Sequence, residues 1–170
     1  TLKAAKKPLI ISGTSLQDPA IMEAAAQVAQ NLGANAGLTL TVPEVNSMGM
    51  AILGGQSLEQ AFAQDYDTIV IVENDLYRRL PAKQVDAALA KAKDVIVLDH
   101  AETETVKKAN IVLSAASFAE GDGTVVSQEG RAQRFYQVYD ASYYKPEYAI
   151  KESWRWIHAI ETGVKGQAIS

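Results

Sequence analysis

The chain of 170 residues contains no cysteine. Disulfides, thiolate-bound iron–sulfur clusters, zinc ribbons and a cysteine nucleophile are therefore excluded within it. Histidine is nearly as scarce, since only His100 and His158 are present, and two imidazoles make no metal site without carboxylates. No apolar run approaches the roughly 20 residues that a membrane-spanning helix needs. These absences remove the commonest redox, metal and membrane roles for this chain.

Basic residues are in the minority, with 16 Lys and Arg against 20 Asp and Glu, a net charge of −4. That balance argues against nucleic-acid binding as the main task, because phosphate contacts need a basic surface. A hydrophobic content of 48% and a charged content of 21% are typical of a globular domain. The chain starts Thr1-Leu2-Lys3, without an initiator Met or a signal peptide, so we expect it to be cut from something longer.

Short apolar runs alternate with helical segments along the first two thirds of the chain. The predicted strands are Pro8–Ile11, Leu38–Val42, Thr68–Val72, Val95–Leu98 and Ile111–Leu113. The predicted helices are Ile21–Leu32, Ser57–Gln64, Ala82–Ala92 and Thr103–Ala109, and Pro43–Gly55 is expected to be irregular. Asp18 and Gly33 mark the ends of the first helix, and Ser57 with Gln60 forms a capping box for the second. The alternation predicts an α/β fold with an open, mostly parallel, doubly wound sheet and Rossmann- or flavodoxin-like layering.

The last third of the chain is rich in aromatic residues. Five of the seven tyrosines lie between Tyr136 and Tyr148, and a helix is predicted from Pro146 to about Thr162. We expect the stripe of Trp154 and Ile157 to pack on the domain, and the stripe of Trp156 and Ile160 to be exposed for a partner. We therefore divide the chain into an α/β domain, residues 1–134, and an aromatic segment with a C-terminal helix, residues 135–170. The second part belongs to the same domain or forms its contact surface.

The turns after the predicted strands are the first places to look for a ligand, since ligands of open parallel sheets bind beyond the carboxyl ends of the strands. These turns are Ser12–Ser15, Glu73–Asp75, Asp99–Glu102 and Ser114–Ser117. Backbone N–H groups of the first turn could hold an anion. It contains one glycine, however, and no dinucleotide fingerprint or GxxxxGK motif occurs, so a plain strand-to-helix turn is the preferred interpretation.

Acidic residues gather in two of these turns. The group consists of Asp99, Glu102 and Glu104 with His100, joined by Glu73 and Asp75. Such a group could bind a divalent cation or perform acid–base chemistry. Consecutive residues rarely converge on one ion, so capping by Asp99 or Thr103 and solvated carboxylates are the favoured interpretation. His158 is expected to be a packing or rim residue, and without a GxSxG motif a serine-hydrolase triad is rejected.

A glycine-bent loop spans residues 120–133, with a short strand predicted at Thr124–Val126. Arg131 is expected to pair with Glu120 or Glu129 and hold this loop in place. Composition and spacing alone say no more about it.

Several motifs, in order along the chain, resemble the signature of the molybdopterin oxidoreductases. They are Gly13 with Gln17, Asn46–Gly49 with Gly54, Glu73-Asn74, Thr103–Thr105 with Ala109-Asn110, Val112–Glu120, Gly123-Thr124 and Glu129–Gln133. The match covers roughly Leu9 to Tyr136. The runs Phe118–Val126 and Arg131–Tyr139 are similar to the branch of this family found in bacterial respiratory complex I. The pattern departs from that of the molybdenum enzymes at Ile52, Asp75, Ser114 and Ser127, which suits that branch.

This resemblance implies a scaffold domain of a longer iron–sulfur subunit. The parent complex would transfer electrons from NADH to quinone, coupled to ion translocation, in a peripheral arm at the cytoplasmic face of the bacterial inner membrane. Cysteines outside this chain would bind its iron–sulfur clusters, and the chain itself is expected to have no catalytic residue, metal or cofactor. The implied partners are the rest of the subunit and other complex I subunits, with no nucleic acid and no direct membrane insertion.

Two alternatives remain open. In the first, the chain is the molybdopterin-guanine-dinucleotide-binding domain of an active molybdenum oxidoreductase, such as a formate dehydrogenase. The cofactor-binding candidates would then be Gly13, Gln17, Asn46, Gly49, Asn74, Glu120 and Arg131. In the second, the chain is a free-standing nucleotide-binding enzyme with an acidic Mg²⁺ site.

Overall fold

The computed structural model describes residues 2–16 and 18–166 of the chain. The described residues fall into two compact units, one within residues 1–55 and 124–134 and the other within residues 56–123 and 135–170. The division into residues 1–134 and 135–170 stays a prediction.

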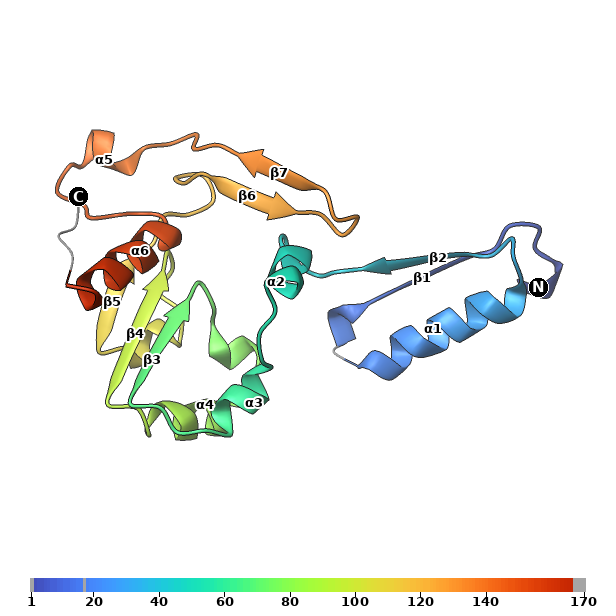
Figure 1. The fold of residues 1–170 in the computed structure, drawn as a ribbon, viewed down its shortest axis with the longest axis horizontal. Helices are drawn as coiled ribbons and strands as arrows, with labels where there is room; N and C mark the ends of the chain where they lie inside the picture. Colours follow the sequence, from blue (N-terminus) through green and yellow to red (C-terminus); the bar gives the residue numbers. More distant parts are fainter. Residues whose placement is uncertain (1, 17, 167–170) are drawn as a thin grey trace. The chain divides into compact units, whose positions relative to one another are not determined.

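The first unit is built on a two-stranded parallel sheet. Strand β1 (Leu9–Gly13) pairs with β2 (Gly37–Thr41), and helix α1 (Pro19–Leu32) connects them and lies along both (Figure 1). The carboxylate of Asp18 accepts the Ala20 N–H at 2.9 Å, and Gly33 ends the helix at a φ of 90°. The predicted strands, helix and caps of this segment are thus confirmed.

Helix α2 (Ser47–Leu53) replaces the irregular segment predicted at Pro43–Gly55, and that prediction was wrong. The helix begins after Asn46, which has a left-handed φ of 66°, and ends at Gly54, with a φ of 77°. Its seven residues make only two turns, too few for an apolar period to stand out in the sequence.

The second unit contains a three-stranded parallel sheet in the order β3–β4–β5. The strands are β3 (Thr68–Val72), β4 (Asp94–Asp99) and β5 (Ile111–Ser114). Its helices are α3 (Leu58–Phe62), α4 (Ala82–Leu89), α5 (Ala141–Tyr144) and α6 (Ser153–Val164). The capping box of Ser57 and Gln60 opens α3 as predicted, whereas the helix predicted at Thr103–Ala109 is only one 3-10 turn, Val106–Lys108.

The core of the second unit lies between the sheet and helices α3 and α4. Its buried residues are Ile71, Leu76, Val85, Leu89, Val95 and Val97, with Leu58 and Phe62 of α3 packed against them. Burial of these aliphatic side chains, each worth about 1.5–3 kcal/mol, is the main force that holds the sheet and helices together.

A hairpin follows the second sheet. Strand β6 (Gly123–Val126) pairs with β7 (Ala132–Phe135), and the short strand predicted at Thr124–Val126 is therefore confirmed. The Ser127 N–H donates to the Arg131 carbonyl at 2.9 Å, and Gly130 adopts a φ of 81° at the turn. Across the described residues, Arg131 forms no ion pair with Glu129, and Glu120 belongs to the other unit.

The predicted fold class is confirmed, because helices alternate with parallel strands and a C-terminal helix follows an aromatic segment. The parallel strands belong to two sheets, β1–β2 and β3–β4–β5. Within residues 2–16 and 18–166, no helix combines the length and the apolar character that crossing a bilayer requires.

Helix α6 begins at Ser153, not at Pro146, and continues through Gly163 to Val164. The segment before it is held in an extended form, since Lys151 forms a parallel bridge with Ala115 and its carbonyl accepts the Ala116 N–H at 2.9 Å. Because of this pairing, α6 begins later in the chain than predicted, and a different face of the helix is turned toward the sheet.

The predicted orientation of α6 was wrong for the same reason. Trp154 is 52% exposed and Ile157 is 46% exposed, whereas Trp156 and Ile160 are half-buried. The indole N–H of Trp156 donates to the Ser114 carbonyl at 2.9 Å, at the end of β5. The Trp156 stripe therefore packs on the unit, and the Trp154 stripe faces outward.

Candidate functional site

The carboxyl edge of the β3–β4–β5 sheet brings together the turns at Glu73–Asp75, Asp99–His100 and Ser114–Ala115. Glu73 has a left-handed φ of 47°, an unusual conformation for a residue other than glycine. Its N–H donates to the Leu98 carbonyl at 2.7 Å, and its carboxylate accepts the hydroxyl of Ser153 at the start of α6. The first residue after β3 is therefore anchored to β4 and to α6.

Asp75 is committed to hydrogen bonds within the fold. Its carboxylate accepts the Tyr77 N–H at 3.3 Å and the hydroxyl of Thr105 at 2.8 Å. Thr105 is fully buried and in turn accepts the Leu76 N–H at 2.8 Å. The neighbouring Asn74 accepts the Nε–H of Arg79 at 3.2 Å. The side chains of this turn therefore stabilise the turn itself.

The predicted acidic group does not converge. Asp99 is buried and accepts the N–H groups of His100 and Ala101 at 2.8 and 3.2 Å, while Glu104 pairs with Lys107 at 2.6 Å. Thr103 caps its turn by accepting the Val106 N–H at 3.2 Å. The described residues contain no group of three His, Asp or Glu side chains that could hold a metal ion. Capping explains Asp99 and Thr103, as the favoured interpretation proposed.

The candidates in the first unit also have roles in packing. A Cβ at Gly13 would lie 2.5 Å from the carbonyl oxygen of Thr41, so only glycine fits there. The side-chain oxygen of Asn46 accepts the Val126 N–H at 2.8 Å, and a Cβ at Gly49 would lie 2.1 Å from that oxygen. The Asn–Gly motif therefore ties the start of α2 to β6. Gln17 lies outside the described residues.

Glu120 lies in the loop after β5, in the second unit. One of its carboxylate oxygens accepts the Ser117 N–H at 3.0 Å. This hydrogen bond lowers the pKa of the Glu120 carboxyl below its ordinary value, so the group is an anion at neutral pH. Its carbonyl accepts the side-chain amide of Gln137 at 3.0 Å, which joins the loop to the segment after β7.

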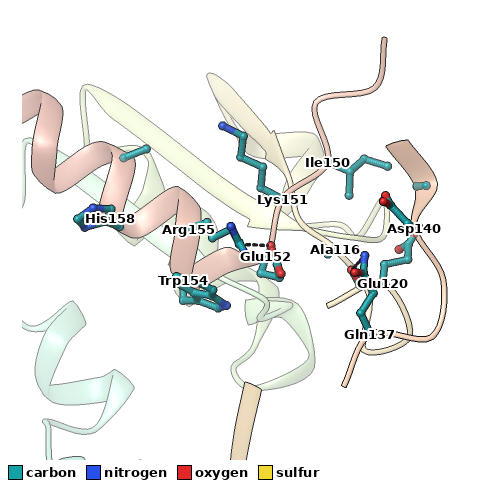
Figure 2. A pocket seen from close by; sticks show the side chains of 12 residues that line it. Ala116, Glu120, Gln137, Asp140, Ile150, Lys151, Glu152, Trp154, Arg155 and His158 are labelled. Atoms are coloured by element: carbon teal, nitrogen blue, oxygen red, sulfur yellow. Dashed lines mark hydrogen bonds and ion pairs between the residues drawn. The ribbon is translucent and has the colours of Figure 1, made fainter. Parts of the chain in front are cut away.

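Glu120 also lines a pocket of about 440 Å³ in the second unit (Figure 2). The other lining residues are Ala116, Gln137, Asp140, Ala141, Ile150, Lys151, Glu152, Trp154, Arg155, His158 and Ala159. Arg155 pairs with Glu152 at 2.7 Å, and its guanidinium lies 4.6 Å from the centre of the Trp154 ring. Among the lining residues whose side chains the structure describes, none carries a hydroxyl or a thiol, and the acidic groups are those of Glu120, Asp140 and Glu152. His158 is a rim residue, as predicted.

The two polar anchors at the sheet edge, Thr105 and Ser153, were not foreseen as important residues. Ser153 is distant in sequence from Glu73 and carries no local signal. Thr105 belongs to the Thr103–Thr105 motif, and the motif does not indicate that its hydroxyl is buried.

Anionic dinucleotides do not fit the residues at this sheet edge. A phosphate there would meet the carboxylates of Glu73, Asp75 and Asp99, and two like charges 4 Å apart repel by about 4 kcal/mol at an effective dielectric constant of 20. The side-chain oxygen of Asn74, the neutral candidate for hydrogen bonding at this edge, already accepts the Nε–H of Arg79.

Comparison with known proteins leads to the same family that the sequence motifs resemble. The model of the molybdopterin oxidoreductase family matches residues 1–161. The G subunit of NADH-quinone oxidoreductase from Pseudomonas putida is 57% identical over 94% of this chain, and that from Pseudomonas fluorescens is 51% identical over 99%. The Escherichia coli K12 protein of the same name is 51% identical over 95% of this chain. The chain spans 18–19% of the length of these relatives.

Proposed function

The chain belongs to the molybdopterin oxidoreductase family, and from that premise we propose that it is a scaffold domain of the G subunit of an NADH–quinone oxidoreductase, without a redox centre of its own. The parent complex transfers electrons from NADH to quinone and couples this transfer to ion translocation. The observation that carries the proposal is the identity of 49–57% to proteins of that name, spread over nearly the whole chain.

The absence of a redox centre in this chain is supported by its chemistry. With no cysteine, it provides no thiolate for an iron–sulfur cluster, so the clusters of the parent bind to cysteines elsewhere. At the edge where active relatives would approach a cofactor, Glu73, Asn74 and Asp75 hydrogen-bond to the protein itself. The chain then contributes shape and contact surface to the other parts of its parent polypeptide and to neighbouring subunits, in a peripheral arm at the cytoplasmic face of the bacterial inner membrane.

The alternative function is a cofactor-binding domain of an active molybdenum oxidoreductase, and the family match itself favours it. In that case the residues Gly13, Gln17, Asn46, Gly49, Asn74, Glu120 and Arg131 would approach the guanine nucleotide. Among them only Arg131 carries a positive charge to balance the phosphates, which weakens this alternative.

The deciding experiment uses the intact parent polypeptide, purified from its own cells through an affinity tag. We expect it to copurify with NADH–quinone oxidoreductase activity and with iron, and to contain less than a tenth of a molybdenum atom per polypeptide by mass spectrometry of metals. Stoichiometric molybdenum with an extractable pterin would favour the alternative. Copurification with neither the activity nor iron would contradict both.

A further inference from the structure

We propose that Tyr139 and Tyr144 form an oxidative modification site, at which a one-electron oxidant joins the two phenol rings into dityrosine. Tyr144 is the last residue of α5 (Figure 1), and Tyr139 lies just before that helix in the chain. Their rings stack, with centroids 5.6 Å apart and planes inclined by 9°. Neither tyrosine has a role in the proposed function, so the two inferences are independent.

The stacked pair is held in place by backbone hydrogen bonds of the second unit. The N–H of Tyr139 donates to the Ala119 carbonyl at 3.0 Å, which ties this segment to the loop after β5. The N–H of Lys145 donates to the Ala141 carbonyl at 3.0 Å and closes the turn of α5. Both rings belong to the same unit, so their contact forms whatever covers this part of its surface.

The orientation of the rings selects Tyr139 as the partner of Tyr144. In a tyrosyl radical the unpaired electron occupies orbitals perpendicular to the ring, with much of its density on the carbons ortho to the oxygen. In parallel rings these orbitals point toward each other, as a new carbon–carbon bond requires. The ring of Tyr143 lies even closer to Tyr144, with centroids 5.1 Å apart, but the planes are inclined by 81°. Its orbitals are therefore nearly at right angles to those of Tyr144.

Competing sites of oxidation in the second unit are absent or disfavoured. The unit contains no cysteine and no methionine, the side chains that are common targets of oxidants. The Nζ atom of Lys151 lies 5.0 Å from the centre of the Trp156 ring. The guanidinium of Arg155 lies 4.6 Å from the centre of the Trp154 ring. A cation over a ring attracts its π electrons, so the removal of an electron from either indole is opposed.

The reaction balances with two molecules of oxidant. Each molecule takes one electron from one phenol, whose proton passes to water, and a neutral tyrosyl radical remains. The two radicals join through a bond between ortho carbons, and the hydrogens on these carbons then move to the phenol oxygens. Dityrosine therefore has two hydrogens fewer than the two separate side chains, and both oxidant molecules leave in reduced form.

The test exposes the intact parent polypeptide to photogenerated ruthenium(III) tris-bipyridine, a one-electron oxidant. Trypsin, which does not cut before Pro146, then releases residues 135–151 as one peptide, and cleavage before Asp140 separates Tyr139 from Tyr144. We expect mass spectrometry to find the two halves of this peptide joined, with the loss of two hydrogens. Tyr139→Phe and Tyr144→Phe should each abolish the joined product, because phenylalanine forms no phenoxyl radical.

Two variants serve as controls for the position of the bond. Tyr66→Phe removes a phenol of the same unit that is distant in sequence, and Tyr143→Phe removes the perpendicular ring, so both should retain the joined product. Halves that are not joined in the natural protein would overturn the proposal. Retention of the product in Tyr144→Phe, or its loss in Tyr143→Phe, would do the same.

Oxidation in urea tests whether the fold directs the reaction. Unfolding separates the stacked rings, so the yield of the joined product should fall severalfold in urea. An equal yield in urea would also overturn the proposal, because closeness in sequence would then be the cause of coupling in place of the stacked contact.

Discussion

The hydroxyl of Thr105 donates a hydrogen bond of 2.8 Å to the carboxylate of Asp75, thirty residues earlier in the chain. The same oxygen accepts the Leu76 N–H, so one fully buried side chain holds the turn after β3 to the segment after β4. A buried hydroxyl that both donates and accepts a hydrogen bond stabilises the fold. Loss of this hydroxyl would leave the buried Leu76 N–H without a partner, which is costly.

Replacing Thr105 by Val keeps the shape of the side chain and removes both hydrogen bonds. We expect Thr105→Val to lower the free energy of unfolding by about 2–3 kcal/mol, because the Leu76 N–H is left buried without a partner. Urea unfolding followed by circular dichroism measures this change. Thr105→Ser retains the hydroxyl and should lose clearly less stability. Equal losses for the two variants would contradict this prediction, because the methyl group would then contribute as much to stability as the two hydrogen bonds.

The second prediction concerns the contact between Asn46 and Gly49. Gly49→Ala should destabilise the protein by about 1–2 kcal/mol, although Ala is normally the better helix former by about 1 kcal/mol. The reason is the 2.1 Å approach of an added Cβ to the amide oxygen of Asn46, which is fixed by Val126.

A double-mutant cycle supplies the control for this contact. Glycine tolerates the left-handed φ of residue 46 and removes the obstructing amide. In the Asn46→Gly background, Gly49→Ala should therefore become neutral or stabilising in urea unfolding. The same loss in both backgrounds would place the cause of the strain elsewhere.

The two tryptophans of α6 should differ in their contribution to stability. Trp156→Ala should lower the free energy of unfolding by about 2–3 kcal/mol, because a half-buried ring and its hydrogen bond to Ser114 are lost. Trp154→Ala should change it by about 1 kcal/mol or less, since the ring is 52% exposed. Denaturant unfolding of the two variants measures the order, and a larger loss for Trp154 would contradict the orientation of the helix.

The sequence predicts the opposite order, with the larger stability loss for Trp154→Ala. The difference is explained by the pairing of Lys151. An apolar stripe identifies which residues share a helix face, and Trp154 with Ile157 was correctly grouped apart from Trp156 with Ile160. Which stripe faces inward depends on where the helix begins. The β-bridge of Lys151 with Ala115 sets that point through a contact distant in sequence, and no local pattern encodes it.

Elements with strong local signals were predicted well. Strand β3 coincides with the run Thr68–Val72, and α1 starts after Asp18 and ends before Gly33, because caps and continuous apolar runs act over a few residues. The buried Thr105 and the Glu73–Ser153 hydrogen bond depend on which strand ends meet, a property of the folded chain. Local pattern therefore predicted the elements of the site, and tertiary contacts determined what its side chains do.

The carboxyl of Glu120 should make stability depend on pH in the acid range. The Ser117 N–H lowers the pKa of this group in the folded state below the ordinary value of 4.5. A lowered pKa means that the stabilisation is present above the unfolded-state pKa and is lost as pH falls through the folded-state pKa. The difference in unfolding free energy between the natural protein and Glu120→Gln should therefore shrink below about pH 4.5. Urea titrations at pH 7, 5 and 3.5 measure it, and a difference that is constant with pH would exclude this linkage.

The final prediction is that the chain does not bind guanine nucleotides or molybdopterin dinucleotide. Asp75 stands where the molybdenum enzymes have proline, and with Glu73 and Asp99 it presents negative charge to any phosphate at the sheet edge. We expect titration calorimetry with GDP or the extracted dinucleotide to give no measurable heat of binding, and the purified chain to show no visible absorbance and no NADH oxidation. Asp75→Pro in a Glu73→Gln background removes two of the charges, and nucleotide affinity that appears there would identify charge as the cause. Micromolar binding by the unaltered chain that disappears in Asn46→Ala or Asn74→Ala would instead establish a working dinucleotide site.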